Sequence, residues 1–331
     1  MIGAMPDIRA TAPQMVGNGR GILAADESIG TMNKRLEAAG VTSSEEQRRD
    51  YREMLVATPH LSQWISGVIL SDDIFRSHVS DGRSFPEYCR QVGLLPGVKV
   101  DTGAKPLAGA PHETVTEGLD DLRRRLAEYG SSGAAFTKWR AVINIGDGLP
   151  TRGALRANAH ALARYAALVQ EAGLVPIVEP EVLMDGDHSL ERCASVTELA
   201  LLMVFDELRG QGVLLEGIVL KPNMVVPGAS SPERVGVAQV ASATLQVLRR
   251  TVPAAVPGVA FLSGGQSPEV ATAHLAALNA NGRHPWQLTF SFGRALVDPA
   301  LKAWRGEPDR VVDGQQALAS RARPNAQATA A

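Results

Sequence analysis

The sequence has few cysteines and no long apolar run, and each shortage excludes a class of protein. Two cysteines, Cys89 and Cys193, in a chain of 331 residues cannot form a disulfide framework. The seven histidines contain no pair spaced four residues apart, so a zinc site has no support. The longest apolar-rich stretch, residues 199–205, is far shorter than the roughly 20 residues of a membrane-spanning helix. We therefore expect a reduced, cytoplasmic protein that binds neither metal nor membrane.

Lysine is also scarce, although the overall charge is balanced. The chain has 33 basic and 35 acidic residues and a net charge of -2, which gives no electrostatic attraction to nucleic acid or to an anionic membrane. Only 6 of the 33 basic residues are lysines. A skewed base composition explains such a shortage, but a remaining lysine also marks a position where a guanidinium cannot act. The lysines are Lys34, Lys99, Lys105, Lys138, Lys221 and Lys302.

Short apolar runs rich in β-branched residues recur along the chain, and a helix-like stretch follows each of them. The eight runs cover residues 21–25, 65–70, 97–100, 134–137, 174–178, 217–220, 259–262 and 288–290. Helical patterns between them include residues 45–56, 155–172, 196–208 and 234–250. This alternation predicts an α/β fold, a single (β/α)8 TIM barrel over residues 1–308 with an N-terminal extension.

The first strand and the C-terminal tail complete this outline. The alternative to the barrel is a doubly wound open sheet, which carries a Gly-x-Gly-x-x-Gly turn after its first strand. No such turn follows residues 21–25, and this favours the barrel.

Residues 309–331 are predicted to form a tail that begins with a helix. From Arg321 onward, its Ala, Pro, Asn and Thr content predicts disorder.

Charged residues close most of the expected strands. In a (β/α)8 barrel the carboxyl ends of the strands form the active site, and residues two apart on a strand share a face. A single charged strand end is ordinarily the edge of solvent, but several that converge on one mouth predict a catalytic centre. Three pairs share a face: Lys99 with Asp101, Lys138 with Arg140, and Glu179 with Glu181.

Lys221 directly follows the apolar run 217–220, so we expect a strand to deliver it into the barrel. Burial disfavours the charged form of an amine and lowers its pKa, and the like charge of Lys138 acts in the same direction. A neutral lysine amine is the nucleophile that forms an imine with a ketone. The alternative is a structural ion pair between Lys221 and Glu179 or Glu181.

Glu179 and Glu181 flank Pro180 and place two carboxylates on one face. Crowded carboxylates raise each other's pKa, so we expect one of them to suit general acid–base work near neutral pH. The alternative is that both are ordinary partners of lysines.

The segments after the seventh and eighth strands predict a phosphate site. Ser263, Gly264 and Gly265 leave backbone N–H groups open to a phosphate, and Gly293-Arg294 would supply a cation. Loops after strands seven and eight are the usual phosphate site of this architecture. Residues 185–188, Asp-Gly-Asp-His, are interpreted as a turn before a helix rather than as a metal site.

Seven motifs then occur in a recognisable order. They are GILAADES at 21–28, GVKVD at 97–101, KWR at 138–140, VPIVEPE at 175–181, LKPNM at 220–224, FLSGGQ at 261–266 and GRAL at 293–296. From about residue 19 to residue 304, the chain resembles the class I, Schiff-base-forming fructose-bisphosphate aldolases. The resemblance implies reversible cleavage of fructose 1,6-bisphosphate to dihydroxyacetone phosphate and glyceraldehyde 3-phosphate in glycolysis and gluconeogenesis, without metal or cofactor.

The resemblance also implies catalytic roles for five residues. Lys221 would form the Schiff base with the C2 ketone, and Glu179 would dehydrate the carbinolamine. Lys138 and Glu181 would assist by charge and orientation. Asp26 would take the proton of the C4 hydroxyl as the C3–C4 bond breaks.

The same resemblance implies two phosphate sites and an assembly. The site for the C1 phosphate would comprise Ser263, Gly264, Gly265, Ser291, Gly293 and Arg294. The other phosphate and the sugar hydroxyls would be bound by Ser28, Arg35, Lys99 and Arg140. Members of the family are commonly homotetramers, which makes a homo-oligomer the expectation here.

One departure from the family concerns the tail. Vertebrate members end in a tyrosine that assists proton exchange, whereas the last tyrosine of this chain is Tyr165. The sequence therefore leaves the part played by the tail open. Two alternative functions also stay open: a Schiff-base aldolase for another ketose phosphate, and a non-catalytic sugar-phosphate-binding scaffold.

Overall fold

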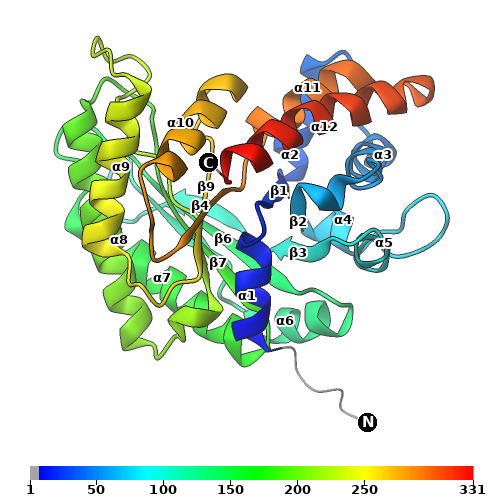
Figure 1. Cartoon of the computed structure of the whole chain (residues 1–331). Helices are drawn as coiled ribbons and strands as arrows, with labels where there is room; N and C mark the ends of the chain where they lie inside the picture. The colour runs from blue at the N-terminus through cyan, green and yellow to red at the C-terminus, as the bar shows by residue number, and fades with distance from the viewer. Residues whose placement is uncertain (1–6, 331) are drawn as a thin grey trace.

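Eight parallel strands form the centre of the molecule. A computed structural model describes residues 7–330 (Figure 1). The order of the strands in the sheet is β1-β2-β3-β6-β7-β8-β9-β10. The backbone N–H of Ala24 donates to Phe292 O at 3.3 Å and joins the two ends of this sheet into a barrel. The strands are β1 Gly21–Ala25, β2 Ile65–Leu70, β3 Leu95–Lys99, β6 Phe136–Ile143, β7 Val175–Val182, β8 Val219–Leu220, β9 Gly258–Phe261 and β10 Gln287–Phe290.

Helices surround the barrel and connect its strands (Figure 1). The helices are α1 Ile8–Val16, α2 Ile29–Ala38, α3 Glu45–Val56, α4 Asp72–Phe75, α5 Phe85–Gln91, α6 Leu122–Ser131, α7 Arg152–Glu171, α8 Leu190–Gly210, α9 Val237–Thr251, α10 Pro268–Ala280, α11 Arg294–Trp304 and α12 Val311–Ala328. Three short 3-10 turns are η1 Leu61–Gln63, η2 Leu215–Gly217 and η3 Pro308–Arg310. Within residues 7–330, no helix combines the length and apolarity that crossing a membrane requires.

Local sequence explains these elements. Every residue of β1 and β2 is buried, as expected for parallel strands covered on both faces. Four helices of 12 or more residues begin at hydroxyl N-caps that satisfy a free backbone N–H. The caps are Ser44 of α3, Thr151 of α7, Ser189 of α8 and Ser267 of α10. The prediction of a turn before a helix at residues 185–188 is thus confirmed.

The N-terminal extension closes one end of the barrel. Helix α1 buries Ala12, Met15 and Val16 in a small core with the inward-facing side chains of the strands. Val16 contacts the amino end of β9, where a Cβ on Gly258 would lie 2.6 Å from its Cγ2. Side chains at the amino ends of the strands are therefore shielded from solvent, and the carboxyl ends are left as the open mouth.

The predicted barrel and its eight strands are confirmed, with two differences. Strands β6 and β7 continue to Ile143 and Val182, because they pair in parallel over eight consecutive positions. Lys138 and Glu179 consequently lie within strands rather than at their ends. In addition, β4 Gly103–Pro106 and β5 Thr114–Glu117 form an antiparallel hairpin beside the mouth that the sequence pattern did not reveal.

The predicted disorder from Arg321 onward is wrong, because α12 continues to Ala328. Composition favoured disorder, but tertiary contacts order the segment. Asn325 is completely buried and accepts a hydrogen bond from Thr272 of α10 at 2.7 Å. Arg323 lies over the ring of Trp64, which immediately precedes β2. The tail therefore ends at the amino ends of the strands, opposite the mouth.

Candidate active site

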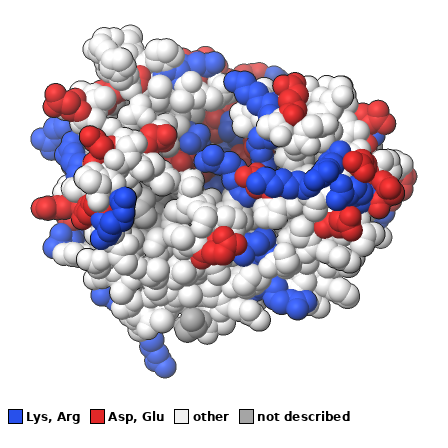
Figure 2. Space-filling view, turned by 90° about the horizontal axis from the view of Figure 1, so that it is seen from above, with Lys and Arg blue, Asp and Glu red and all other residues white. Residues whose placement is uncertain are grey.

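The carboxyl ends of the strands surround a cavity of about 360 Å³. Figure 2 looks down on this face and shows acidic and basic side chains gathered in a central hollow. All fifteen residues predicted from the sequence line this cavity. They are Asp26, Ser28, Arg35, Lys99, Lys138, Arg140, Glu179, Glu181, Lys221, Ser263, Gly264, Gly265, Ser291, Gly293 and Arg294. The barrel thus brings together residues that lie up to 268 positions apart in the sequence (294 - 26).

Strands β6 and β7 supply the centre of the site. Alternate residues of a strand share a face, so Lys138 and Arg140 point inward from β6, and Glu179 and Glu181 point inward from β7. The parallel register places Arg140 opposite Glu179. Lys221 enters from the next strand, one residue beyond β8.

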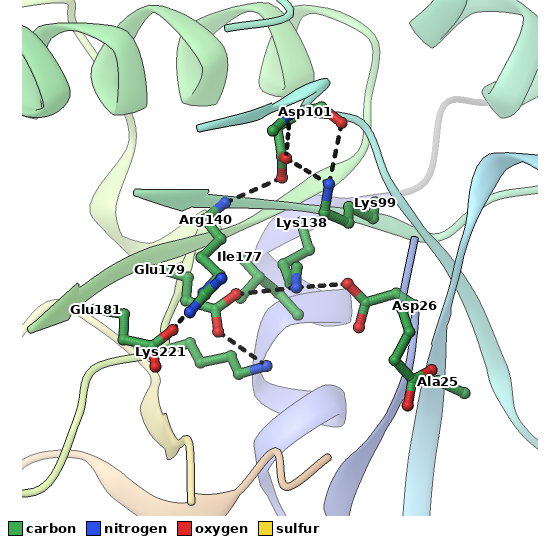
Figure 3. Close-up of polar contacts among 12 residues, drawn as sticks. Ala25, Asp26, Lys99, Asp101, Lys138, Arg140, Ile177, Glu179, Glu181 and Lys221 are labelled. Carbon is green, nitrogen blue, oxygen red and sulfur yellow. Dashed lines mark hydrogen bonds and ion pairs between the residues drawn. The ribbon is translucent and has the colours of Figure 1, made fainter. Parts of the chain in front are cut away.

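Four buried charged groups form a chain across the barrel (Figure 3). Lys138 Nζ lies 2.5 Å from Asp26 Oδ2 and 3.1 Å from Glu179 Oε2. Glu179 Oε1 lies 3.2 Å from Lys221 Nζ. Two carboxylates and two amines therefore alternate, and each charge has a partner of opposite sign.

The two amines of this chain differ in proton affinity. Burial lowers the pKa of Lys221, and the positive charge of Lys138 lowers it further against the opposing effect of Glu179. For Lys138 burial also favours the neutral form, but the carboxylates of Asp26 and Glu179 outweigh it and raise the pKa. Lys221 is therefore the amine that gives up its proton more readily, and Lys138 remains a cation. The predicted effect of Lys138 on Lys221 is confirmed.

The prediction that crowding with Glu181 raises the pKa of Glu179 is wrong. Burial alone would raise the pKa of Glu179, but the positive charges of Lys138 and Lys221 outweigh this effect. The pKa therefore lies below its ordinary value. Glu181 is instead ion-paired with Arg140, which separates it from the neighbouring carboxylate electrostatically. The pKa of Asp26 is likewise lowered: its burial is outweighed by the two lysines.

The predicted phosphate loop has the required shape. Gly264 and Gly265 have φ values of +54° and +77°, a backbone conformation that residues other than glycine rarely adopt. A Cβ on Gly265 would lie 2.8 Å from the sulfur of Met184. The buried hydroxyl of Ser291 has no hydrogen-bond partner among the described residues. Arg294 begins α11, whose free N–H groups favour an anion.

The four residues predicted for the other phosphate follow β1 or belong to β3 and β6, and three of them are ion-paired. Arg35 lies 2.5 Å from Asp298 and also pairs with Glu27. Lys99 pairs with Asp101, and Arg140 pairs with Glu181, as noted above. The hydroxyl of Ser28 accepts the Thr31 N–H and caps α2.

Two acidic residues organise this part of the cavity. Glu27 was not singled out from the sequence, and Asp101 was paired with Lys99 without an assigned role. Glu27 binds Arg35, and Asp101 accepts hydrogen bonds from Gly103 N at 3.1 Å and Arg140 N at 3.2 Å. Both lie within or beside the quoted motifs, and Asp101 shares a face with Lys99. The spacing of two residues between Lys99 and Asp101 was therefore the sequence signal that places Asp101 in the site.

Among residues 7–330, no group of three or more His, Cys, Asp or Glu side chains is arranged to hold a metal ion. The carboxylates of the site face amines and guanidinium groups instead. The chemistry available in the cavity is therefore that of a buried amine nucleophile, flanking carboxylates and anion-binding groups.

Comparisons with known proteins agree with this geometry. The family "Fructose-bisphosphate aldolase class-I" matches residues 7–331. A probable class 1 fructose-bisphosphate aldolase of Xanthomonas campestris is 51% identical over 323 residues, covering 97% of each chain. The cytosolic fructose-bisphosphate aldolase 4 of Arabidopsis thaliana is 48% identical over 98% of this chain and 82% of its own.

A solved structure is equally similar. Fructose-bisphosphate aldolase of Plasmodium falciparum, crystallised in complex with TRAP and a small-molecule inhibitor, superposes with a TM-score of 0.96 at 44% identity. The match covers 97% of this chain and 93% of that one. The barrel, the full-length identities and the family match together show that this chain belongs to the class I fructose-bisphosphate aldolases and is a lyase with their activity.

Proposed function

We propose that Lys221 forms the Schiff base of the aldolase reaction and that Glu179 and Asp26 move its protons. The observation that carries this proposal is the position of Lys221: its amine is buried, has a lowered pKa and lies 3.2 Å from a carboxylate. A neutral amine attacks the C2 ketone of fructose 1,6-bisphosphate and yields a carbinolamine. Glu179, ionised at rest, takes the proton that the nitrogen loses as the C–N bond forms, while the alkoxide takes one proton from solvent. Glu179 then returns its proton to the carbinolamine hydroxyl, which leaves as water and produces the iminium.

Cleavage follows from the iminium. Asp26 accepts the proton of the C4 hydroxyl, the C3–C4 bond breaks, and its electron pair moves through C2 to the iminium nitrogen. Glyceraldehyde 3-phosphate leaves, Asp26 gives up the proton that it accepted, and the enamine on Lys221 takes up one proton at C3. Hydrolysis of the resulting iminium releases dihydroxyacetone phosphate. Lys138 keeps Asp26 and Glu179 ionised between steps, because it contacts both, and Glu181 holds Arg140 in place.

The two ends of the cavity suit the two phosphates. Ser291 and Arg294 are not paired within the described chain, so they are available for the C1 phosphate together with the glycine loop at residues 263–265. At the other end, a phosphate has to compete with carboxylates for Arg35 and Lys99. We therefore propose weaker binding at that end.

The proposal extends to the cellular location and the oligomeric state of the protein. The cytosolic plant relatives support a cytoplasmic location. Family membership supports a homo-oligomer, with a tetramer as its form. Neither nucleic acid nor a membrane is a proposed partner, since the net charge is only -2.

Reductive trapping tests the nucleophile directly. Borohydride added in the presence of dihydroxyacetone phosphate should leave a covalent tag on Lys221, located by peptide mass mapping. Lys221→Arg keeps a positive charge but cannot form an imine, so it should remain untagged and inactive. A tag on another lysine, or activity abolished by a chelator, would refute the proposal. Comparing kcat/KM for fructose 1-phosphate and sedoheptulose 1,7-bisphosphate tests the alternative substrates.

A further inference from the structure

A buried arginine of α3 binds the residues on both sides of Asp26. Arg52 is 1% exposed. Its Nε donates a hydrogen bond to Ala25 O at 3.3 Å, and its Nη2 donates to Glu27 Oε2 at 3.0 Å. One guanidinium therefore holds the last residue of β1 and the residue that follows Asp26.

These contacts explain where Asp26 points. Asp26 lies one residue beyond β1, so its own position depends on what holds its neighbours. Successive side chains of an extended segment point to opposite sides. Glu27 is held toward α3 by Arg52, and Asp26 points into the barrel, where its carboxylate lies 2.5 Å from Lys138 (Figure 3).

Stability alone does not account for a charge at this position. Burial lowers the pKa of Arg52 to about 10, which still leaves the side chain protonated at neutral pH. Burying a paired charge is ordinarily no better for stability than a well-packed apolar side chain of similar size. The fork of Arg52, by contrast, has the directional donors that fix two points of one loop.

We propose that Arg52 is a positioning residue that aims the carboxylate of Asp26 into the reaction cavity. This inference rests on the proposed role of Asp26 as the base for the C4 hydroxyl. Because Glu27 also pairs with Arg35, the same contact connects this position to the rim of the cavity. Displacement of a catalytic group by about 1 Å is enough to slow a reaction by up to about 100-fold.

The test compares Arg52→Met and Arg52→Lys with the unchanged chain. Arg52→Met removes both donors and should lower kcat for fructose 1,6-bisphosphate by at least about tenfold, with little change in KM. Arg52→Lys keeps the charge and should restore part of kcat. Borohydride tagging of Lys221 with dihydroxyacetone phosphate should stay normal, because Lys221 and Glu179 lie on other strands.

The pH profile supplies a readout that a purely structural role would not move. Lys138 lowers the pKa of Asp26. In Arg52→Met, Asp26 is free to move away from Lys138, so its pKa should rise and the acidic limb of kcat should shift to higher pH.

The matched control is Arg48→Met on the same helix, one turn earlier. Arg48 is less buried than Arg52, with 12% of its side chain exposed. It donates to Asn33 at 2.9 Å and lies 3.8 Å from Asp73, away from the end of β1. It should lose stability at most, with kcat and the pH profile unchanged.

The outcomes separate this inference from the proposed function. Retention of full kcat and of the acidic limb in both Arg52 variants would overturn the inference, provided that Asp26→Asn abolishes cleavage. Loss of Lys221 tagging in folded Arg52→Lys would overturn it as well, since Arg52 would then support the site in general. Should Asp26→Asn retain cleavage, the proposed base itself is wrong. If Arg52→Met does not fold, Arg52→Lys and its pH profile decide the question.

Discussion

Lys138 and Lys221 contact the two oxygens of a single carboxylate, that of Glu179, at 3.1 and 3.2 Å. The second contact of Lys138, with Asp26, makes the difference between the two amines. Lys138 faces two carboxylates and stays charged, whereas Lys221 faces one carboxylate and one cation in the same buried space. The fold thereby shifts the pKa values of two chemically identical side chains in opposite directions.

Substitution of Lys138 by methionine should move imine formation to higher pH. The substitution removes a cation that lowers the pKa of Lys221, so the neutral amine appears at higher pH. The measurement is the extent of borohydride tagging of Lys221 against pH. Lys302→Met, the same change at an exposed lysine, is the control. An unchanged tagging curve for Lys138→Met would contradict the electrostatic coupling.

Asp26 should contribute stability that is lost in acid. Burial acts upward on its pKa, but Lys138 and Lys221 bring the value below the ordinary 3.8, so the unfolded chain binds its proton first. The contribution is therefore complete above about pH 4 and disappears as pH falls through the folded-state pKa. Thermal unfolding of Asp26→Asn should show a smaller decrease in Tm between pH 7 and pH 3 than the parent. Equal decreases would mean that Asp26 is not held by the lysines.

Gly265→Ala should weaken phosphate binding, and Gly282→Ala provides a matched control. Both glycines have positive φ, +77° and +89°, so alanine costs about 1 kcal/mol of strain at either position. Only at Gly265 does the new Cβ meet a neighbour, Met184, whereas at Gly282 nothing lies within 4 Å. We expect KM to rise on the order of tenfold for Gly265→Ala alone, which is about 1.4 kcal/mol of binding. Equal KM values in steady-state assays would exclude the loop from phosphate binding.

Deletion of residues 321–331 should reduce stability and leave cleavage intact. The segment packs on α10 and near Trp64, at the end of the barrel opposite Lys221. Asn325→Ala breaks the buried hydrogen bond with Thr272 and should cost about 1–3 kcal/mol in denaturant unfolding. A lower kcat without a change in unfolding free energy would instead indicate that the tail acts in catalysis.

Much of the site was predictable because barrel topology turns sequence order into spatial order. Each inward-facing residue follows an apolar run, and parallel strands bring all their carboxyl ends to one mouth. Lys221 and Glu179 could therefore be assigned to one cavity without coordinates. The motifs added the family and the reaction.

Other features depend on contacts between segments far apart in the chain. The length of β6 and β7 follows from their mutual pairing, and the order of the tail follows from its packing on α10. Neither contact leaves a local signal in composition or periodicity, so the extent of the strands and the continuation of the tail helix beyond Arg321 were not expected.

The sequence by itself determined the strand–helix alternation, the residues that enter the mouth and the family. Only the tertiary structure decided which charges meet. The pKa of Glu179 was expected to be raised by the nearby carboxylate of Glu181. In the structure, Arg140 binds Glu181 and two lysines bind Glu179. A pKa depends on distances of a few ångströms in a medium of low dielectric, and such distances are properties of the packed barrel rather than of spacing along the chain.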